Sequence, residues 1–550
     1  MKLTPFAKGF IALVIVAVVA VVVWLQFGGK AKDWAAEGTP GASGSAAASA
    51  QGIDGSDFKA LDPSKDPDRK APVTGVEAVK LGTGKLDRPL VVGINTWAGH
   101  APGIVANAGF APNNERAIYK TKYGLAVEFK IFEDPAAKLT AFASGQMDIM
   151  WDTVDSWARE ASTLAEQNIS GKAILQQDWS RGGDGIVSLK TIKSIEDLKG
   201  KKIATTRYTP SHWLLLYLLN QSGLNVEDKR TIEKNLVFTN EAPLAAAAFR
   251  SKNVDAAVTW EPDLSGAVKA RETEAHVLVS TASATNVVAD CLVARQEIVD
   301  KYPETLRDFV HGWFDGIEQM AKDPTGSNEL VGSVLKLPPE DVSGMLSGLK
   351  LTPFADNAAF FGLSSGSRSQ FKSLFDTAFI VWRKLGVVSK VVDSSANVDT
   401  RFVASLADQY AGQKVQEDFK PDASVKTDPA KQRAIVNKQI LIHFATGSDK
   451  IMDGSLFTLD SLGDTMIGFG NTTLSIEGHT DSTGASDVNR QLSKRRADAV
   501  KKYLVDAFKI PEARFKTSGF GSDKPVASNA TDDGRLQNRR TEIKVILNAE

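Results

Sequence analysis

The sequence predicts a chain with two folded regions, of the α/β and α+β classes, preceded by a transmembrane helix. Three observations support this fold class. Short β-branched runs alternate with amphipathic stretches from Leu90 onward, the same alternation restarts at Ala434 after a polar segment, and an uncharged apolar run lies near the N-terminus. At 550 residues the chain is also too long for one ordinary core, so separate domains are expected.

The N-terminal apolar run is long enough to cross a membrane. No charge lies between Lys8 and Lys30, and residues 10–25 are apolar throughout. A bilayer requires about 20 mostly apolar residues, whereas the apolar part of a cleaved signal peptide is usually about 7 to 15 residues long. The length of the run and the bulky Trp24 favour an uncleaved anchor over residues 1–30. Because lysines flank the run on both sides, charge does not decide its orientation.

A linker follows the anchor. Residues 31–87 are rich in Ala, Gly and Ser and then in Asp, Lys and Pro, without apolar periodicity, which is typical of a flexible segment.

The central region, residues 88–412, is predicted to be an α/β domain. Alternating strands and helices favour mostly parallel strand pairing. The predicted strands are 90–94, 127–131, 202–205, 236–239 and 256–259, and the predicted helices include 136–144, 211–221, 242–251 and 303–320. A second linker is expected at 413–433, where the chain is polar and holds two prolines.

The C-terminal region, residues 434–550, repeats strand and helix patterns in a compact unit. The order is strand, helix, strand, helix, strand, followed by a closing strand. The predicted elements are 439–444, 456–467, 473–477, 491–507, 513–517 and 541–547.

Composition argues against several classes of function. A formal net charge of −1 gives no reason to expect nucleic acid as a partner. Cys291 is the single cysteine, so the chain forms no internal disulfide and has no thiolate cluster for a metal, and its apolar surroundings suggest a core residue. The six histidines are scattered, and no nucleophile, base and orienting group come together in sequence. We therefore expect neither an enzyme nor a cofactor or metal site.

Short motifs in the C-terminal region occur in the order and at the spacing of the OmpA-like family. The region from about 434 to 548 resembles this family, whose domains bind peptidoglycan through the diaminopimelate of the stem peptide. The motifs that carry the resemblance are 477–484 (EGHTDSTG), 489–497 (NRQLSKRRA), 519–521 (GFG) and 538–540 (NRR).

Asp481 and Arg496 match the two ligand-binding positions of that family. A zwitterionic headgroup requires an acceptor for its ammonium and a planar fork of donors for its carboxylate, and these two side chains supply both. The resemblance places Asn489 and Thr480 in the same pocket. The alternative is a capping aspartate and a solvated helical arginine. Family spacing selects Arg496 rather than Arg495, because adjacent helical residues point about 100° apart.

Two neighbouring features are expected to be structural. His479 is predicted to have no second metal ligand nearby, so it is assigned no metal or catalytic role. The motif at 538–540 is expected to stabilise the fold rather than to touch the ligand.

The central region is similar to periplasmic solute-binding proteins of the nitrate, taurine and alkanesulfonate type. This resemblance implies a two-lobed fold that closes on a ligand. It is carried by residues 93–99 (GINTWAG), 144–148 (SGQMD), 195–203 (IEDLKGKKI) and 253–262 (NVDAAVTWEP).

Ligand contacts in such folds come from loops at the carboxyl ends of strands. The candidate solute-binding residues are Thr96, Trp97, Asp152, Thr153, Arg207, Thr209, Ser211, Trp260 and Glu261.

The turn before the apolar helix at 211–221 suggests an anion site, to which Arg207 would add charge. Alternatively, Thr209 or Ser211 is only a helix cap with Pro210 in the first turn. Trp97 and Trp260 could line a cleft or lie in the core. A small anionic solute is expected, although two of the candidates, Asp152 and Glu261, are acidic and leave its identity open.

Together these features predict a single-pass inner-membrane protein with its domains in the periplasm, acting as a tethered solute receptor or sensor. An alternative is a structural envelope scaffold whose central domain binds a protein. A proton-driven stator shares the anchor and the OmpA-like domain, but residues 9–29 contain no ionisable side chain to carry a proton. An enzyme related to thiamin-precursor synthesis would require a reactive histidine and clustered cysteines.

Overall fold

The computed structural model describes residues 75–364, 368–415, 434–440, 442–444, 447–470, 472–508 and 510–547. The predicted anchor at 1–30 and most of the predicted linkers at 31–87 and 413–433 lie outside these residues. Within the described ranges, no helix is both long enough and apolar enough to cross a membrane.

The first central sheet has six strands in the order β11-β4-β10-β3-β1-β2. β1 pairs in parallel with β2 and β3, whereas β10 runs antiparallel to β3 and β4, and β4 runs antiparallel to β11. The strands are β1 (Leu90–Ile94), β2 (Val127–Ile131), β3 (Ile149–Thr153), β4 (Gly171–Ser180), β10 (Ala289–Arg295) and β11 (Leu349–Leu351).

The second central sheet has five strands in the order β7-β6-β8-β5-β9. β6 pairs in parallel with β7 and β8, and β5 runs antiparallel to β8 and β9. The strands are β5 (Asp184–Leu189), β6 (Ile203–Thr206), β7 (Leu236–Thr239), β8 (Ala256–Trp260) and β9 (Ala275–Ser280).

The expectation of mostly parallel strands is therefore wrong, because both central sheets are mixed. The chain leaves the first sheet after β4 and returns to it as β10, and these leaving and returning strands run against their neighbours. Only the strands joined by helical crossovers, β1 to β3 and β6 to β8, pair in parallel.

The chain passes between the two central sheets twice. Residues 181–183 join β4 to β5, and residues 281–288 join β9 to β10. The crossings are bonded to each other: the Ser180 and Thr281 hydroxyl oxygens lie 2.8 Å apart, and Thr281 N donates to Asp184 O at 2.8 Å. Two sheets joined by two adjacent crossings give the two-lobed arrangement that the sequence predicted.

The helices of the central region follow the predicted pattern closely. All the predicted helices are present, and each begins and ends within two residues of its predicted bounds. The helices are α2 (Ala101–Ala106), α3 (Ile118–Tyr123), α4 (Pro135–Ala143), α5 (Val154–Glu166), α6 (Pro210–Gln221), α7 (Val226–Lys234), α8 (Ala242–Arg250), α9 (Asp263–Ala270), α10 (Gln296–Lys301), α11 (Pro303–Lys322), α12 (Pro324–Leu335), α13 (Pro339–Ser347), α14 (Phe354–Phe360), α15 (Gln370–Lys384) and α16 (Arg401–Ala404).

Close packing fixes the helices that surround the first sheet. A Cβ at Gly316 of α11 would lie 2.0 Å from Pro102 O of α2, so only glycine permits this helix contact. α15 is tied to α5 by Trp382 Nε1, which donates to Asp155 O at 2.8 Å. The indoles of Trp157, Trp213, Trp313 and Trp382 are fully buried in the core.

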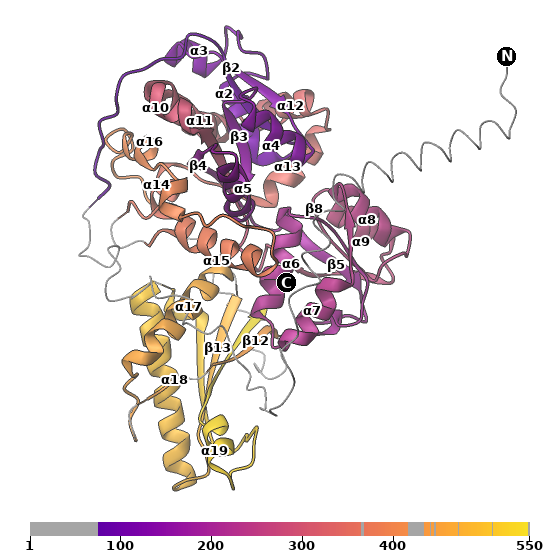
Figure 1. Ribbon diagram of the computed structural model, residues 1–550, viewed down its shortest axis with the longest axis vertical. Helices are drawn as coiled ribbons and strands as arrows, with labels where there is room; N and C mark the ends of the chain where they lie inside the picture. The colour runs from indigo at the N-terminus through magenta and orange to yellow at the C-terminus, as the bar shows by residue number, and fades with distance from the viewer. Residues whose placement is uncertain are drawn as a thin grey trace, which may run out of the picture. The chain divides into compact units, whose positions relative to one another are not determined.

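The C-terminal domain has a four-stranded sheet in the order β12-β15-β13-β14, with α18 lying along it (Figure 1). β13 and β14 are parallel, and β15 runs antiparallel to β12 and β13. The elements are β12 (Ala434–Ile440), α17 (Leu456–Gly468), β13 (Thr472–His479), α18 (Ser486–Phe508), β14 (Phe515–Gly521), α19 (Asp532–Asn538) and β15 (Thr541–Leu547). The predicted order of strands and helices is confirmed, and α19 is an addition that the sequence did not predict.

Candidate binding sites

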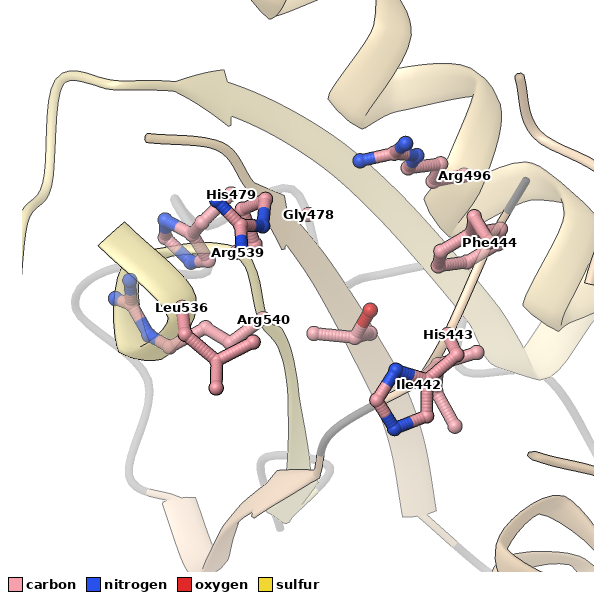
Figure 2. Close-up of a pocket in the computed structure, with 10 residues that line it drawn as sticks. Ile442, His443, Phe444, Gly478, His479, Arg496, Leu536, Arg539 and Arg540 are labelled. Carbon is pink, nitrogen blue, oxygen red and sulfur yellow. The ribbon is translucent and has the colours of Figure 1, made fainter. Parts of the chain in front are cut away.

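The C-terminal domain contains a pocket of about 90 Å³. Figure 2 shows Arg496 and Phe444 on one side of it and Arg539 and Arg540 on the other. The arginine side chains make the lining basic, which suits a carboxylate-bearing ligand. The lining residues are Ile442, His443, Phe444, Gly478, His479, Arg496, Leu536, Arg539, Arg540 and Thr541.

Arg496 is held at the pocket by two contacts from the segment before α17. Its Nε donates to Ser448 O at 3.0 Å, and its guanidinium carbon lies 4.9 Å from the centre of the Phe444 ring. Burial lowers the pKa of Arg496, and the nearby positive charge of Arg539 lowers it further. The guanidinium is therefore positioned by its own domain before any ligand arrives.

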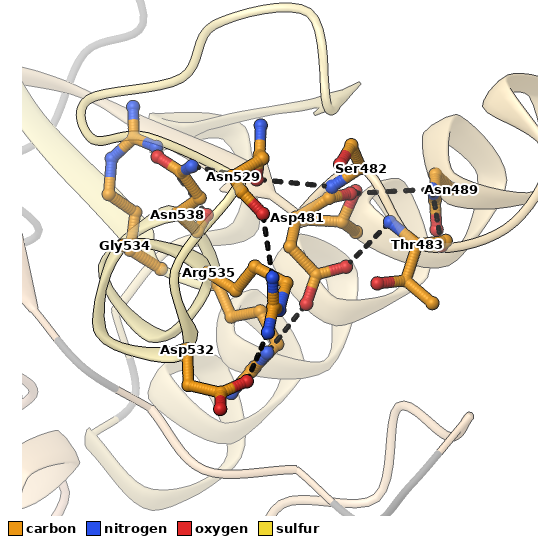
Figure 3. Close-up of polar contacts among 12 residues, drawn as sticks. Asp481, Ser482, Thr483, Asn489, Asn529, Asp532, Gly534, Arg535 and Asn538 are labelled. Carbon is orange, nitrogen blue, oxygen red and sulfur yellow. Dashed lines mark hydrogen bonds and ion pairs between the residues drawn. The ribbon is translucent and has the colours of Figure 1, made fainter.

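Asp481 lies in the loop between β13 and α18 and is only 7% exposed. Its carboxylate accepts from Thr483 N at 2.9 Å (Figure 3). It also accepts from Arg539 Nη1 at 2.5 Å. Burial alone would raise the pKa of Asp481, but the hydrogen bonds from Arg539 and Thr483 hold it below its ordinary value. The carboxylate is thus an ionised acceptor beside the basic pocket.

The direct partner of Asp481 is Arg539 rather than Arg496. Arg496 acts on Asp481 only through space, and both arginines line the pocket. The expectation that residues 538–540 only stabilise the fold is corrected in part. Asn538 is structural, since its side chain bonds Val526 N and Ala527 O, but Arg539 and Arg540 also line the pocket.

Asn489 and Thr480 shape the loop that carries Asp481. Asn489 Nδ2 donates to Thr483 O at 2.9 Å, and Thr480 Oγ1 donates to Asp481 O at 2.9 Å. Asn529 bridges Ser482 N and Asn538 Nδ2 on the other side of the loop (Figure 3). Asn489 and Thr480 are buried and belong to the support of the carboxylate rather than to the pocket lining.

His479 has potential metal ligands near it, which corrects the expectation that it has none. Glu477 and Glu542 bring their carboxylate oxygens within 4.8 Å of its ring nitrogen. Both carboxylates already bond to cations, however, with Lys544 Nζ at 2.7 Å from Glu477 and Arg540 Nη2 at 2.6 Å from Glu542. Burial and the charge of Arg540 lower the pKa of His479 to about 4, so the ring is neutral.

In the central region, the structure brings two of the predicted solute-binding residues together at the end of the first sheet. Trp97, 6% exposed, donates from Nε1 to Asp178 Oδ2 at 3.3 Å. Thr153, at the end of β3, is in register with Asp290 of β10, which is in register with Asp178 of β4 on its other side. Trp97 and Thr153 thus lie close to a group of acidic side chains.

Thr96 and Glu261 are engaged elsewhere. Thr96 donates from N to Glu133 Oε1 at 2.8 Å, and Glu261 accepts from Ser265 Oγ at 2.8 Å. Trp260 is partly exposed at the end of β8 and is in register with Asp184 of β5.

Asp152 belongs to a buried ion cluster. Lys138 Nζ lies 3.3 Å from Asp152 and 3.0 Å from Glu160, and all three side chains are at most 1% exposed. The same ammonium lies 4.4 Å from the centre of the Trp151 ring. Asp152 therefore balances the charge of a buried lysine.

The start of α6 combines features of both sequence interpretations. Thr209 is the N-cap residue and Pro210 opens the helix, but the Thr209 hydroxyl donates to Thr206 O at 2.8 Å and caps nothing. The Ser211 hydroxyl is fully buried and has no hydrogen-bond partner among the described residues. Arg207 is exposed, with its guanidinium carbon 4.0 Å from the centre of the Phe238 ring.

The sequence analysis did not single out four buried aspartates beside the crossings between the two central sheets. They are Asp155, Asp178, Asp184 and Asp290. A signal was available for Asp290, because it interrupts a strand that is otherwise largely apolar, and a buried charge in such a position requires a reason.

Comparison with known proteins identifies both domains. Residues 443–539 match the family model described as the OmpA family, and residues 114–327 match the one described as NMT1/THI5 like. The chain therefore carries an OmpA domain at its C-terminus and an NMT1/THI5-like domain in its middle.

Individual relatives match one domain each. Outer membrane porin F of Pseudomonas aeruginosa is 37% identical over 116 residues, which are 21% of this chain and 33% of the porin. The taurine-binding periplasmic protein of Escherichia coli is 26% identical over 290 residues, which are 51% of this chain and 84% of that protein. This chain thus spans about a third of the length of the porin F sequence. Among solved structures, the periplasmic aliphatic sulphonate-binding protein of Escherichia coli aligns with a TM-score of 0.45 at 18% identity, over 57% of this chain and 98% of that one.

Proposed function

We propose that this chain is a periplasmic envelope protein, anchored in the inner membrane, that binds peptidoglycan and a small solute. Peptidoglycan lies outside the cytoplasm, which sets the orientation of the chain. In this proposal the anchor, first linker, solute-binding domain, second linker and peptidoglycan-binding domain occupy residues 1–30, 31–87, 88–412, 413–433 and 434–550.

The arrangement of opposite charges at the C-terminal pocket carries the proposal for peptidoglycan. The free end of diaminopimelate bears an ammonium and a carboxylate. Asp481 supplies an ionised acceptor at the loop, and Arg496 supplies a planar fork of donors at the pocket wall. We assign the ammonium to Asp481 and the carboxylate to Arg496, with Asn489 and Thr480 holding the loop in place.

Co-sedimentation of the full chain, purified in detergent, with peptidoglycan sacculi tests this assignment. Asp481→Ala and Arg496→Ala should each weaken retention at least tenfold, because a hydrogen bond to a charged group contributes about 1.5 to 3 kcal/mol. Arg495→Ala is the matched control. Arg495 is the exposed residue just before Arg496 on α18, so this variant should bind sacculi like the wild type. Wild-type retention by both test variants would refute the assignment.

The central domain is proposed to bind a small solute with an acidic group. The exposed Arg207 and the Ser211 hydroxyl at the start of α6, which has no partner among the described residues, support this class, as does the similarity to the taurine-binding protein. The named relatives are binding proteins and porins, which supports binding rather than catalysis, and we propose no cofactor. A thermal-shift screen of sulfonates and nitrate should show stabilisation that grows with ligand concentration. A screen without any shift would argue against an acidic solute.

A further inference from the structure

Four aspartates from four elements gather where the chain crosses between the central sheets. Asp155 lies in the first turn of α5, Asp178 near the end of β4, and Asp184 and Asp290 near the starts of β5 and β10. Asp155 and Asp178 are fully buried, and the other two are at most 7% exposed. They are here called the crossing aspartates.

The backbone holds these side chains as neighbours. Asp290 and Asp178 are partners in the register of β10 and β4. Asp184 N donates to Ser180 Oγ at 3.2 Å, which ties the start of β5 to the end of β4. Trp382 fixes the backbone of Asp155 through the bond to its carbonyl, and the indole N–H of Trp97 bonds Asp178. The cluster is thus built by both crossings, the first sheet and α5.

No lysine or arginine of the described residues forms an ion pair with the crossing aspartates. The cations nearest in sequence to Asp155 are the buried Lys138 and the partly exposed Arg159, and they pair instead with Asp152 and Glu160. Burial raises the pKa of Asp155 and of Asp178 to about 7 and that of Asp184 to about 6, and it raises the pKa of Asp290 as well. Buried negative charge without a partner is costly, so these groups hold protons unless a compensating cation is bound.

Unpartnered oxygens provide an independent sign of a ligand. Asp155 Oδ1 and Asp178 Oδ1 have no hydrogen-bond partner within the described part of the chain, although both side chains are fully buried. Buried carboxylate oxygens in native proteins almost always accept hydrogen bonds, so these two atoms are available acceptors for a ligand's donors.

The spacing of the carboxylates argues against a metal ion held by three or more of them. Among the described residues, the one group of acidic and histidine side chains that gathers its ligand atoms within 4.8 Å is Glu477, His479 and Glu542. Two neighbouring carboxylates are enough to accept hydrogen bonds from an organic ammonium, which carries three N–H donors.

We propose that the crossing aspartates form the subsite for an ammonium group of the solute that the central domain binds. The inference rests on the proposed solute-binding function and extends it, since it requires the solute to carry an amine in addition to any acidic group. Asp178 and Asp290 accept from the ammonium beside the Trp97 indole, and Asp155 contributes negative charge from the side of α5.

Calorimetric titration of the full chain with matched pairs of probes tests the inference. In each pair, a hydroxyl group replaces the amine. The pairs are 1,4-diaminobutane with 1,4-butanediol, and taurine with 2-hydroxyethanesulfonate. At least one amine should bind, and its hydroxyl counterpart should bind at least tenfold more weakly, because the charged donor is lost.

Asp178→Asn and Asp155→Asn, which keep the shape of the side chain, should weaken binding of that amine at least tenfold. Asp408→Asn, at an exposed position, should bind like the wild type. Retention on sacculi shows that each variant remains folded in its C-terminal domain, and circular dichroism checks the rest.

The outcomes separate the two proposals. Tight binding of 2-hydroxyethanesulfonate, without a preference for taurine, would overturn the ammonium subsite and leave the solute function standing. Wild-type amine affinity in both test variants would overturn the location. Failure of every probe to bind would count against the subsite and the solute function together.

Discussion

Arg539, which follows α19, donates to the carboxylate of Asp481 at 2.5 Å across 58 positions of sequence. This ion pair places a second guanidinium at the pocket that Arg496 lines and keeps the acceptor ionised. If the domain binds the stem peptide as proposed, binding is therefore coupled to the protonation state of Asp481 through a residue outside the loop and helix that carry Asp481 and Arg496.

Arg539→Gln should shift the pH dependence of sacculus binding. Removing the guanidinium takes away a hydrogen bond and a positive charge that lower the pKa of Asp481, so the carboxyl will protonate at a higher pH. The pH at which half of the protein is released from sacculi should therefore rise relative to the wild type. Co-sedimentation across an acid series measures it, with Arg495→Gln as control, and an unchanged midpoint would contradict the coupling.

Lys138→Met should destabilise the central domain severely. The substitution leaves Asp152 and Glu160 buried without the shared ammonium, and breaking a buried ion pair in this way costs about 3 to 5 kcal/mol. Chemical denaturation monitored by tryptophan fluorescence gives the free energy of unfolding. Lys322→Met removes an exposed lysine and should change it little. Equal stabilities for the two variants would show that Asp152 does not depend on Lys138.

Asp178→Asn should flatten the pH dependence of stability without solute. Burial raises the pKa of Asp178 from 3.8 to about 7, so between these values the folded chain holds a proton that the unfolded chain has lost. The free energy of unfolding must then fall as pH rises through this window, by up to about 1.4 kcal/mol per pH unit for one such group. The variant lacks this loss and should be more stable than wild type above about pH 7. Thermal melts across the window measure the slope, Asp408→Asn should keep it, and parallel slopes for all three proteins would disprove the claim.

Gly99→Ala should disturb the partners of the crossing aspartates. An added Cβ would lie 1.9 Å from Asp178 Oδ2 and 2.6 Å from Trp97 Nε1, so both side chains must move, and overpacking of this kind costs about 1 to 3 kcal/mol. Gly266→Ala in α9 meets nothing within 4 Å and should be neutral or stabilising. Melting temperatures of the two variants provide the comparison. If Gly99→Ala and Gly266→Ala have the same melting temperature, the tight packing around Asp178 is disproved.

Local pattern predicted the elements better than their pairing. β1, β2 and β7 have the predicted bounds because each is a short run rich in β-branched residues between polar segments. The direction of β10 could not be predicted, because its antiparallel pairing with β3 and β4 depends on a chain that leaves and returns to the sheet. A short stretch of sequence contains no information about pairing between strands that are far apart in the chain.

The candidate sites show the same difference between what local sequence patterns predict and what depends on long-range packing. Asp481 and Arg496 were found through motif spacing, but the contact of Asp481 with Arg539 arises only when α19 packs beside the loop. Asp152 of β3 was expected at a ligand and forms an ion pair with Lys138 of α4. Asp155 lies in the first turn of α5, where an aspartate is also common at the surface, and Asp184 follows Gly182 and Gly183, so neither carries a local signature of burial.

The position of β10 between β3 and β4 has a consequence for synthesis on the ribosome. The strands of the second sheet, β5 to β9, are contiguous in sequence, so that sheet has all its strands before residue 289 emerges. Until β10 follows, β3 and β4 each present an unpaired edge, the feature that makes nascent sheets prone to aggregate. The first lobe to begin is thus the last to be completed, and the nascent chain must carry its open edges while the whole second lobe is made.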